Sequence, residues 1–80
     1  MEDLKELVKS GNAEGTAKKV EEMINSGSES EAIMKQGLIP AMDEVGDLFQ
    51  KGEFFVPEML VAARAMQQGL NVIKPKLVDA

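Results

Sequence analysis

Residues 57–77 read PEMLVAARAMQQGLNVIKPKL, and their apolar side chains recur at alternating steps of four and three residues. The members of this row are Met59, Ala63, Met66, Leu70, Ile73 and Leu77. Such spacing predicts a helix that packs the row against near-parallel neighbouring helices. Pro57 suits the first helical position, since its missing N–H would have no partner there, and it holds Val56 extended. Pro75 is expected to fray or end the helix.

A second helical pattern precedes this one, over residues 28–51. Ser28 and Glu31 have the spacing of a capping box, in which each side chain satisfies a free backbone amide at the helix start. The apolar residues keep helical spacing throughout and are Met34, Leu38, Ala41, Met42, Val45, Leu48 and Phe49. Pro40 lies inside the pattern and removes one backbone hydrogen bond, so we expect a kink near Leu38 and Ile39 without a break.

Two shorter helices are predicted in the first 27 residues. Leu4, Leu7 and Val8 have the spacing of one helical face, and Gly11 is expected to end this first helix. Asn12 is placed to cap the second helix, because its side chain can accept a hydrogen bond from a free backbone amide. The apolar row of the second helix is Ala13, Ala17, Val20, Met23 and Ile24.

Four helical patterns joined by short glycine-marked turns, with no stretch of period two, predict an all-α fold. We expect an antiparallel four-helix bundle whose third helix is kinked at Pro40. Gly37, Gly46 and Gly69 lie inside helical patterns, where each costs up to about 1 kcal/mol relative to alanine. Close contact between helices is the expected reason for all three glycines.

The composition limits the chemistry available to the chain. Eighty residues suffice for one small domain. The chain has no Cys and no His, which excludes disulfides, Cys/His zinc sites and catalysis by thiols or histidines. Asp and Glu number 14 against 9 Lys and Arg, and the net charge of -5 disfavours nucleic acid as a partner. We predict that the chain is not an enzyme by itself.

Acidic residues provide the groupings that most resemble a metal or catalytic site. Asp43, Glu44 and Asp47 lie close together on one predicted helix, but a carboxylate-bridged metal site in a helical bundle also uses histidines. We therefore expect no metal site and a solvated acidic face. Arg64, the single arginine, is expected to form a structural ion pair with Asp43, Asp47 or Glu58.

All three aromatic residues lie close to the predicted turn between the last two helices. We call this group of large apolar residues the Phe-rich end; it consists of Phe49, Phe54, Phe55, Val56, Met59 and Leu60. Not all six side chains can point into one small core. They either pack the end of the bundle or form a docking surface for a flat apolar ligand or a second domain.

The same region resembles a known family. The motifs are Gly37-Leu38-Ile39-Pro40-Ala41-Met42, Val45-Gly46-Asp47-Leu48-Phe49, Gly52-Glu53-Phe54-Phe55-Val56-Pro57-Glu58-Met59 and Ala62-Ala63-Arg64-Ala65-Met66. As a linked series they resemble the helical cap module of cobalamin-dependent methyltransferases, which include methionine synthase and the corrinoid proteins of methanol, methylamine and methoxyl-aromatic methyl transfer. The first two helices match this family only in pattern.

This resemblance implies a cap that shields the upper, methyl-bearing face of cobalamin and gates methyl transfer. Carried over by position, it implies that Phe49, Val56 and Met59 contact the cofactor, with Val56 in place of the longer leucine common in the family. The family's cobalt-ligating histidine lies in an Asp-x-His-x-x-Gly motif of a following domain, and that motif is absent here. We therefore expect residues 1–76 to be a cap domain, residues 77–80 to begin a linker to a cobalamin-binding Rossmann-like domain, and the chain to be the N-terminal fragment of a longer corrinoid protein.

The resemblance further implies cobalamin as the cofactor of the full-length protein, with none expected on this fragment. The implied partners are a C-terminal cobalamin-binding domain and substrate-specific methyltransferase subunits. The residues leave open an alternative, a stand-alone helical module that binds a protein partner or its own copy through the Phe-rich end. We expect the isolated chain to self-associate. With no apolar run near the roughly 20 residues of a membrane span and no signal-peptide pattern, a cytoplasmic location is expected.

Overall fold

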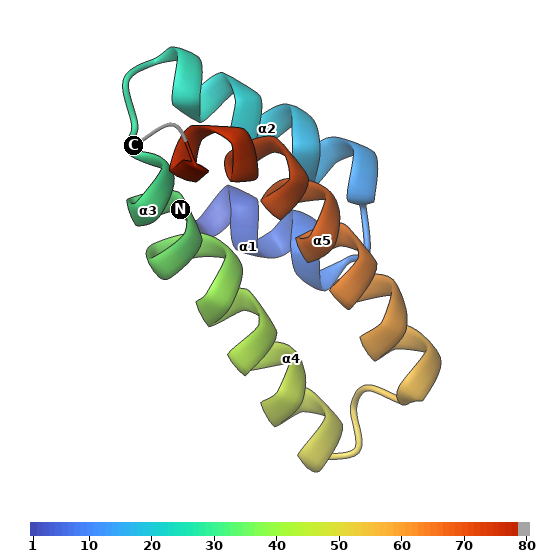
Figure 1. The fold of residues 1–80 in the computed structure, drawn as a ribbon. Helices are drawn as coiled ribbons and strands as arrows, with labels where there is room; N and C mark the ends of the chain where they lie inside the picture. The colour runs from blue at the N-terminus through green and yellow to red at the C-terminus, as the bar shows by residue number, and fades with distance from the viewer. Residues whose placement is uncertain (79–80) are drawn as a thin grey trace.

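Four helical rods build the structure, a computed structural model that describes residues 1–78 (Figure 1). The elements are α1 (Glu2–Lys9), α2 (Ala13–Asn25), α3 (Ser30–Ile33), the π-helical segment η1 (Met34–Leu38), α4 (Ile39–Gln50) and α5 (Val56–Val78). The third rod is continuous through α3, η1 and α4. Within residues 1–78 there is no strand, so the predicted all-α four-helix bundle is confirmed.

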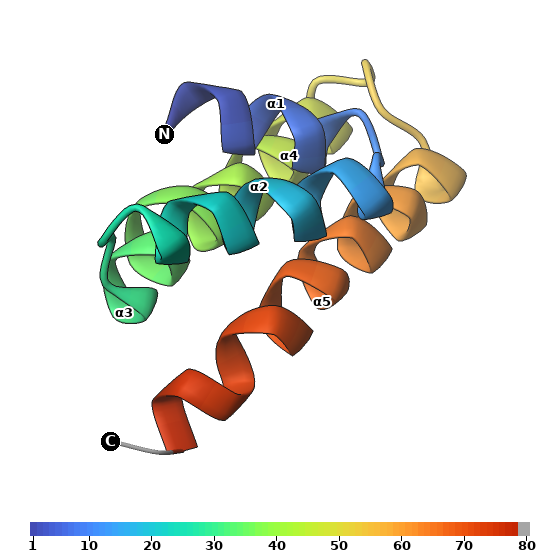
Figure 2. The ribbon, with the colours of Figure 1, turned by 90° about the horizontal axis from the view of Figure 1, so that it is seen from above.

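The first two rods begin and end as the sequence predicts. The side chain of Asn12 caps α2 by accepting a hydrogen bond from the Gly15 N–H at 2.8 Å. Gly11, in the turn between α1 and α2, has a φ of +75°, a conformation that other residues adopt at a cost. Helix α1 buries Leu4 and Val8 and crosses the bundle against α2, α4 and α5 (Figure 2).

Helix α2 packs along α5 through small residues. Thr16 is fully buried, and its hydroxyl donates a hydrogen bond to the Asn12 carbonyl at 2.8 Å. A Cβ built on Gly69 would lie 3.1 Å from Thr16 Cγ2 and 3.1 Å from Leu38 Cδ2. Gly69 therefore permits the close helix contact that the sequence predicts.

The irregular segment of the third rod lies where the sequence predicts a kink. Pro40 has no N–H to donate to the carbonyl four residues earlier, and the Ile39 N–H bonds the Met34 carbonyl, five residues back. The rod continues through this π-helical segment without a break. Gly37 is buried within it, and a Cβ there would lie 2.6 Å from Leu4 Cδ2. Gly37 thus also serves close packing, as predicted.

Three predicted helix ends are wrong. Helix α5 begins at Val56, so Val56 is helical and not extended, and Pro57 is the second helical residue. Ser28 and Glu31 form no capping box, because α3 begins one residue later than the box requires and its N-cap, Glu29, makes no side-chain hydrogen bond. Pro75 does not end α5, which runs on to Val78. Pro75 has no N–H to donate to the Asn71 carbonyl, so α5 continues past it with one backbone hydrogen bond fewer.

The core side of α5 also differs from the predicted row. Among residues 56–75 of α5, those that are fully buried or nearly so are Ala62, Ala65, Gly69 and Ile73. Of the predicted row only Ile73 is buried, Ala63 is exposed, and the side chain of Leu77 lies outside the described part of the chain. At Gly69 this buried side is small because Thr16 of α2 and Leu38 lie close to the backbone of α5. The larger methionines of the predicted row lie to one side of this contact, half-buried.

The remaining core is aliphatic. Its fully buried hydrophobic residues are Leu4, Val8, Val20, Ile33, Leu38, Ala41, Val45, Ala62, Ala65 and Ile73. None of the three phenylalanines belongs to it. The aromatic side chains are therefore outside the core of the bundle.

Candidate functional site

The turn between α4 and α5 is held by backbone hydrogen bonds. The Gly52 N–H donates to the Phe49 carbonyl at 3.1 Å, and the Glu53 and Phe54 N–H groups both donate to the Leu48 carbonyl, at 2.9 and 3.1 Å. At the start of α5, Glu58 accepts a hydrogen bond from the Phe55 N–H at 3.1 Å. This last bond is the carboxylate half of a capping box, which satisfies a free backbone N–H at the start of α5.

The Phe-rich end is largely exposed. Relative accessibilities are 43% for Phe49, 65% for Phe55, 55% for Val56 and 66% for Leu60. Phe54 and Met59 are half-buried. Packing of the bundle end therefore accounts for only part of this group, and the structure favours the other reading, a docking surface.

Two apolar rows of matched spacing run away from this turn. The row on α4 consists of Ile39, Met42, Gly46 and Phe49, and the row on α5 consists of Val56, Met59, Ala63 and Met66. Both rows advance in steps of three, four and three residues, which keeps each on one face of its helix. All eight residues are exposed or half-buried, and none is charged. The predicted contact residues Phe49, Val56 and Met59 are members of these rows.

The two rows share the side of the α4–α5 pair that is turned away from α1. On α4, Glu44 forms ion pairs with Lys5 and Lys9 of α1, and on α5, Val61 lies against Gly11 in the turn after α1. Successive helical residues are rotated by about 100°, so Gly46 and Ala63, each two positions further on, point to the opposite side. We call the eight residues of the two rows the open face.

Gly46, in the middle of the α4 row, has no internal packing role. A Cβ built on it meets no atom within 4 Å, and its φ is not positive. The prediction that this glycine allows close contact between helices of the bundle is therefore wrong, although it is right for Gly37 and Gly69.

An ion-paired cluster joins α1 to α4 on the side opposite the open face. The Glu44 carboxylate forms ion pairs with two lysines of α1: its Oε1 lies 2.9 Å from Lys9 Nζ, and its Oε2 lies 3.2 Å from Lys5 Nζ. The hydrogen bonds from Lys9 and then Lys5 lower the pKa of the Glu44 carboxyl, and the bond to Glu44 raises the pKa of Lys9. Glu44 is therefore part of an interhelical cluster and does not belong to a solvated acidic face.

The predicted ion pair of Arg64 does not form with any of its three expected partners. Asp47 pairs instead with Lys51, one turn along α4, at 2.9 Å, and Glu58 caps α5. Arg64 lies on the outer side of α5, beside the first turn of α2, which places it away from α4. Asp43 is exposed, as predicted.

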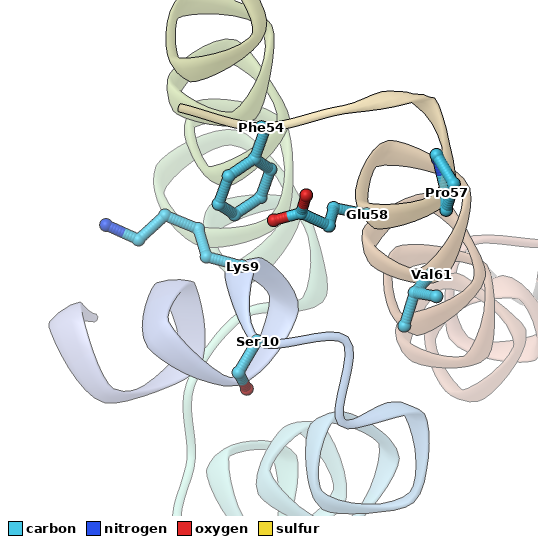
Figure 3. A pocket seen from close by; sticks show the side chains of 6 residues that line it. All are labelled: Lys9, Ser10, Phe54, Pro57, Glu58 and Val61. Carbon is cyan, nitrogen blue, oxygen red and sulfur yellow. The ribbon is translucent and has the colours of Figure 1, made fainter. Parts of the chain in front are cut away.

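A groove of about 430 Å³ lies on the α1 side of the Phe-rich end and was not predicted (Figure 3). Its lining residues are Lys9, Ser10, Phe54, Pro57, Glu58 and Val61. Phe54 points between Lys9 and Glu58, so this side mixes charged and apolar groups and differs from the open face. Helices α1 and α5 approach each other only in the folded chain, and no local sequence pattern indicates such a groove.

Residues 1–78 contain neither a membrane-spanning helix nor a metal-binding group of side chains. No helix there has the length and apolar character needed to cross a membrane. No three or more His, Cys, Asp or Glu side chains in that range are placed to hold a metal ion together.

Comparison with known proteins places the chain in a family. The model of a family described as a B12 binding domain matches residues 1–74. The chain belongs to this B12 binding domain family. The chain is also similar, at 34% identity over 73 residues, to trimethylamine corrinoid protein 1 of Methanosarcina acetivorans, covering 91% of this chain and 34% of the relative. Monomethylamine corrinoid protein 1 of the same organism is 33% identical over 66 residues, covering 82% and 30%.

A solved structure confirms the fold of this B12 binding domain. The monomethylamine corrinoid protein of Methanosarcina barkeri matches with a TM-score of 0.90 and 29% identity, covering 94% of this chain and 35% of that chain. The resemblance to the cap module of corrinoid proteins is thereby confirmed. The chain spans about a third of the length of the relatives it matches.

The residues of this B12 binding domain fit contact with cobalamin. The open face contains no His, Cys, Asp or Glu side chain that could ligate cobalt. It presents apolar side chains and, at Gly46, a stretch of bare backbone where a Cβ would meet nothing. Such a surface can cover a flat group and keep water from it.

Proposed function

We propose that this chain is the helical cap of a corrinoid methyl-carrier protein, and that its open face covers the upper, methyl-bearing face of cobalamin. The observation that carries the proposal is the pair of uncharged rows on α4 and α5, in which Ile39, Phe49, Val56 and Ala63 are exposed and the other four residues are half-buried in the chain alone. Phe49, Val56 and Met59 are the proposed contact residues. Two of them are more than 40% exposed although they are large and apolar.

The cap would act by exclusion. Cobalamin, when bound in another domain, supplies the cobalt chemistry of methyl transfer. An apolar lid keeps water and stray nucleophiles away and offers no reactive group of its own. The lid must also move aside for the methyl donor and acceptor, so gating is its proposed contribution to turnover. By itself the chain would not be an enzyme.

The proposed domain plan follows the sequence. Residues 1–76 form the cap and residues 77–80 begin a linker to a cobalamin-binding domain; residues 79 and 80 lie outside the described part of the chain. The proposed partners are that domain and the methyltransferase subunits that exchange methyl groups with it. A cytoplasmic location stays a prediction from the sequence.

The experiment that tests the cap uses a chimaera. Residues 1–78 replace the matching third of the Methanosarcina barkeri monomethylamine corrinoid protein, and the chimaera is loaded with methylcobalamin. Phe49→Ala should speed the photolytic loss of the methyl group several-fold, because shielding is reduced. Asp43→Ala is the matched control, since Asp43 is an exposed residue of the same helix outside the open face. Equal rates in the parent chimaera and the Phe49 variant would contradict the proposed role.

A second function, self-association through the Phe-rich end, is favoured by one observation. Phe55 and Leu60 are 65% and 66% exposed, the highest values among the large hydrophobic residues described as exposed. An uncovered group of this kind in a small chain favours contact with a second copy. A stand-alone interaction module would use this contact as its function, whereas a cap would lose it when its cobalamin domain is present.

A further inference from the structure

Gly46 is a mid-helix glycine for which the chain itself supplies no reason. A glycine inside a helix costs stability relative to alanine, so it is usually retained for close packing or for an unusual φ. Gly37 and Gly69 have such packing neighbours, since a Cβ built on Gly37 would lie 2.6 Å from Leu4 Cδ2 and one built on Gly69 would lie 3.1 Å from Leu38 Cδ2. Gly46 has neither a neighbour within 4 Å nor a positive φ.

The surroundings of Gly46 point to a contact outside this chain. It lies in the α4 row between Met42 and Phe49, on the side turned away from α1. The α5 row likewise carries its smallest residue, Ala63, between two methionines. The backbone of α4 is therefore bare at a point where larger apolar side chains flank it on the same face.

We propose that Gly46 is the point at which the backbone of α4 touches the cobalamin-bearing surface, so that the contact extends along α4 as far as Met42 and is not confined to the α4–α5 turn. This inference rests on the proposed function. The occupant is the cobalamin-bearing part of a corrinoid protein, because the chain matches a B12 binding domain and only a third of its relatives' length. The uncharged rows suit a flat, apolar contact.

The test measures Gly46→Ala in two ways. In the 80-residue chain alone, the melting temperature should rise by about 4 °C, because alanine is the better helix former and nothing obstructs the added methyl. In the methylcobalamin-loaded chimaera, photolysis should become about fivefold faster or more, since an extra methyl in a close contact weakens docking by at least about that factor. Gly69→Ala is the matched glycine control and should lower the melting temperature.

The outcomes are distinct. A raised melting temperature together with faster photolysis supports the inference. A lowered melting temperature of the chain alone would overturn it, because Gly46 would then have an internal role. If Phe49→Ala speeds photolysis while Gly46→Ala does not, the cap proposal stands and the contact at Gly46 is overturned. If neither variant changes the rate, both proposals are overturned.

Discussion

Lys9 Nζ lies 2.9 Å from Glu44 Oε1 and thereby ties the last turn of α1 to the middle of α4. Lys5 reaches the other carboxylate oxygen at 3.2 Å, one turn earlier on α1. Glu44 thus pairs with two cations of one helix, and such a network of charges contributes more to stability than an isolated surface pair. The cluster holds α1 on the side of α4 that leaves the open face uncovered.

We predict that Glu44→Gln destabilises the chain at pH 7 by about 1 kcal/mol or less, since the carboxylate is partly exposed. The pKa of Glu44 is lowered in the fold, so its contribution is present above the unfolded carboxyl pKa and is lost as the pH falls through the folded value. The difference between the parent chain and the variant should therefore vanish in acid. Urea melts at pH 7 and at about pH 3 measure this.

Glu31→Gln is the control for that prediction, because Glu31 pairs with Lys35 within one helical rod at 2.8 Å and joins no separate helices. Its variant should change the urea midpoint less than Glu44→Gln does. Equal shifts for the two variants would show that the interhelical position of Glu44 has no special effect.

A second prediction concerns the turn after α1. Gly11 has a φ of +75°, and a Cβ on it would collide with Val61 Cγ1 of α5. Gly11→Ala should cost at least about 2 kcal/mol, the sum of left-handed backbone strain and overpacking. Gly27→Ala is the matched control, with a φ of +102° but no atom within 4 Å. Chemical unfolding should show a larger loss for Gly11, and Val61→Ala should restore part of it; equal losses would contradict the close contact.

A third prediction tests the exposure of the Phe-rich end. The isolated chain should form dimers or larger species as its concentration rises, because Phe55 and Leu60 are about two-thirds exposed. Phe55→Ser combined with Leu60→Lys should leave it monomeric with unchanged helix content. Light scattering and circular dichroism measure both properties. A parent chain that stays monomeric over a wide concentration range would exclude self-association.

The sequence predicts the helices well because their signals are local. The cap at Asn12, the stop at Gly11 and the irregularity before Pro40 all depend on residues within a few positions of one another. The position of the Phe-rich end follows from the same local spacing. Which of its side chains are exposed depends on which helices approach each other in the folded chain. The absence of packing neighbours around Gly46 depends on the same tertiary arrangement, and no local sequence pattern specifies it.

The core side of α5 illustrates this limit. The row through Met59 and Met66 and the row through Ala62 and Ala65 both have helical spacing, and hydrophobic size favours the methionines as core residues. The structure buries the alanines on the same side of α5 as Gly69, where Thr16 of α2 and Leu38 lie close to the helix backbone. Periodicity identifies both rows, but only the distance between the helices decides which one is buried.

A last prediction separates these two rows with one type of substitution at adjacent positions. Ala62→Leu should destabilise the chain by about 1–3 kcal/mol, because Ala62 is fully buried. Ala63→Leu should change stability by about 0.5 kcal/mol or less, because Ala63 is exposed on the open face. Urea unfolding of the two isomeric variants measures the difference.

In the methylcobalamin-loaded chimaera, Ala63→Leu should instead have the larger effect on the photolysis rate. This variant leaves the fold intact, but it should speed photolysis because the added side chain crowds the proposed contact. A destabilising Ala63→Leu beside a neutral Ala62→Leu would instead assign the core to the methionine row and would remove the structural basis of the open face.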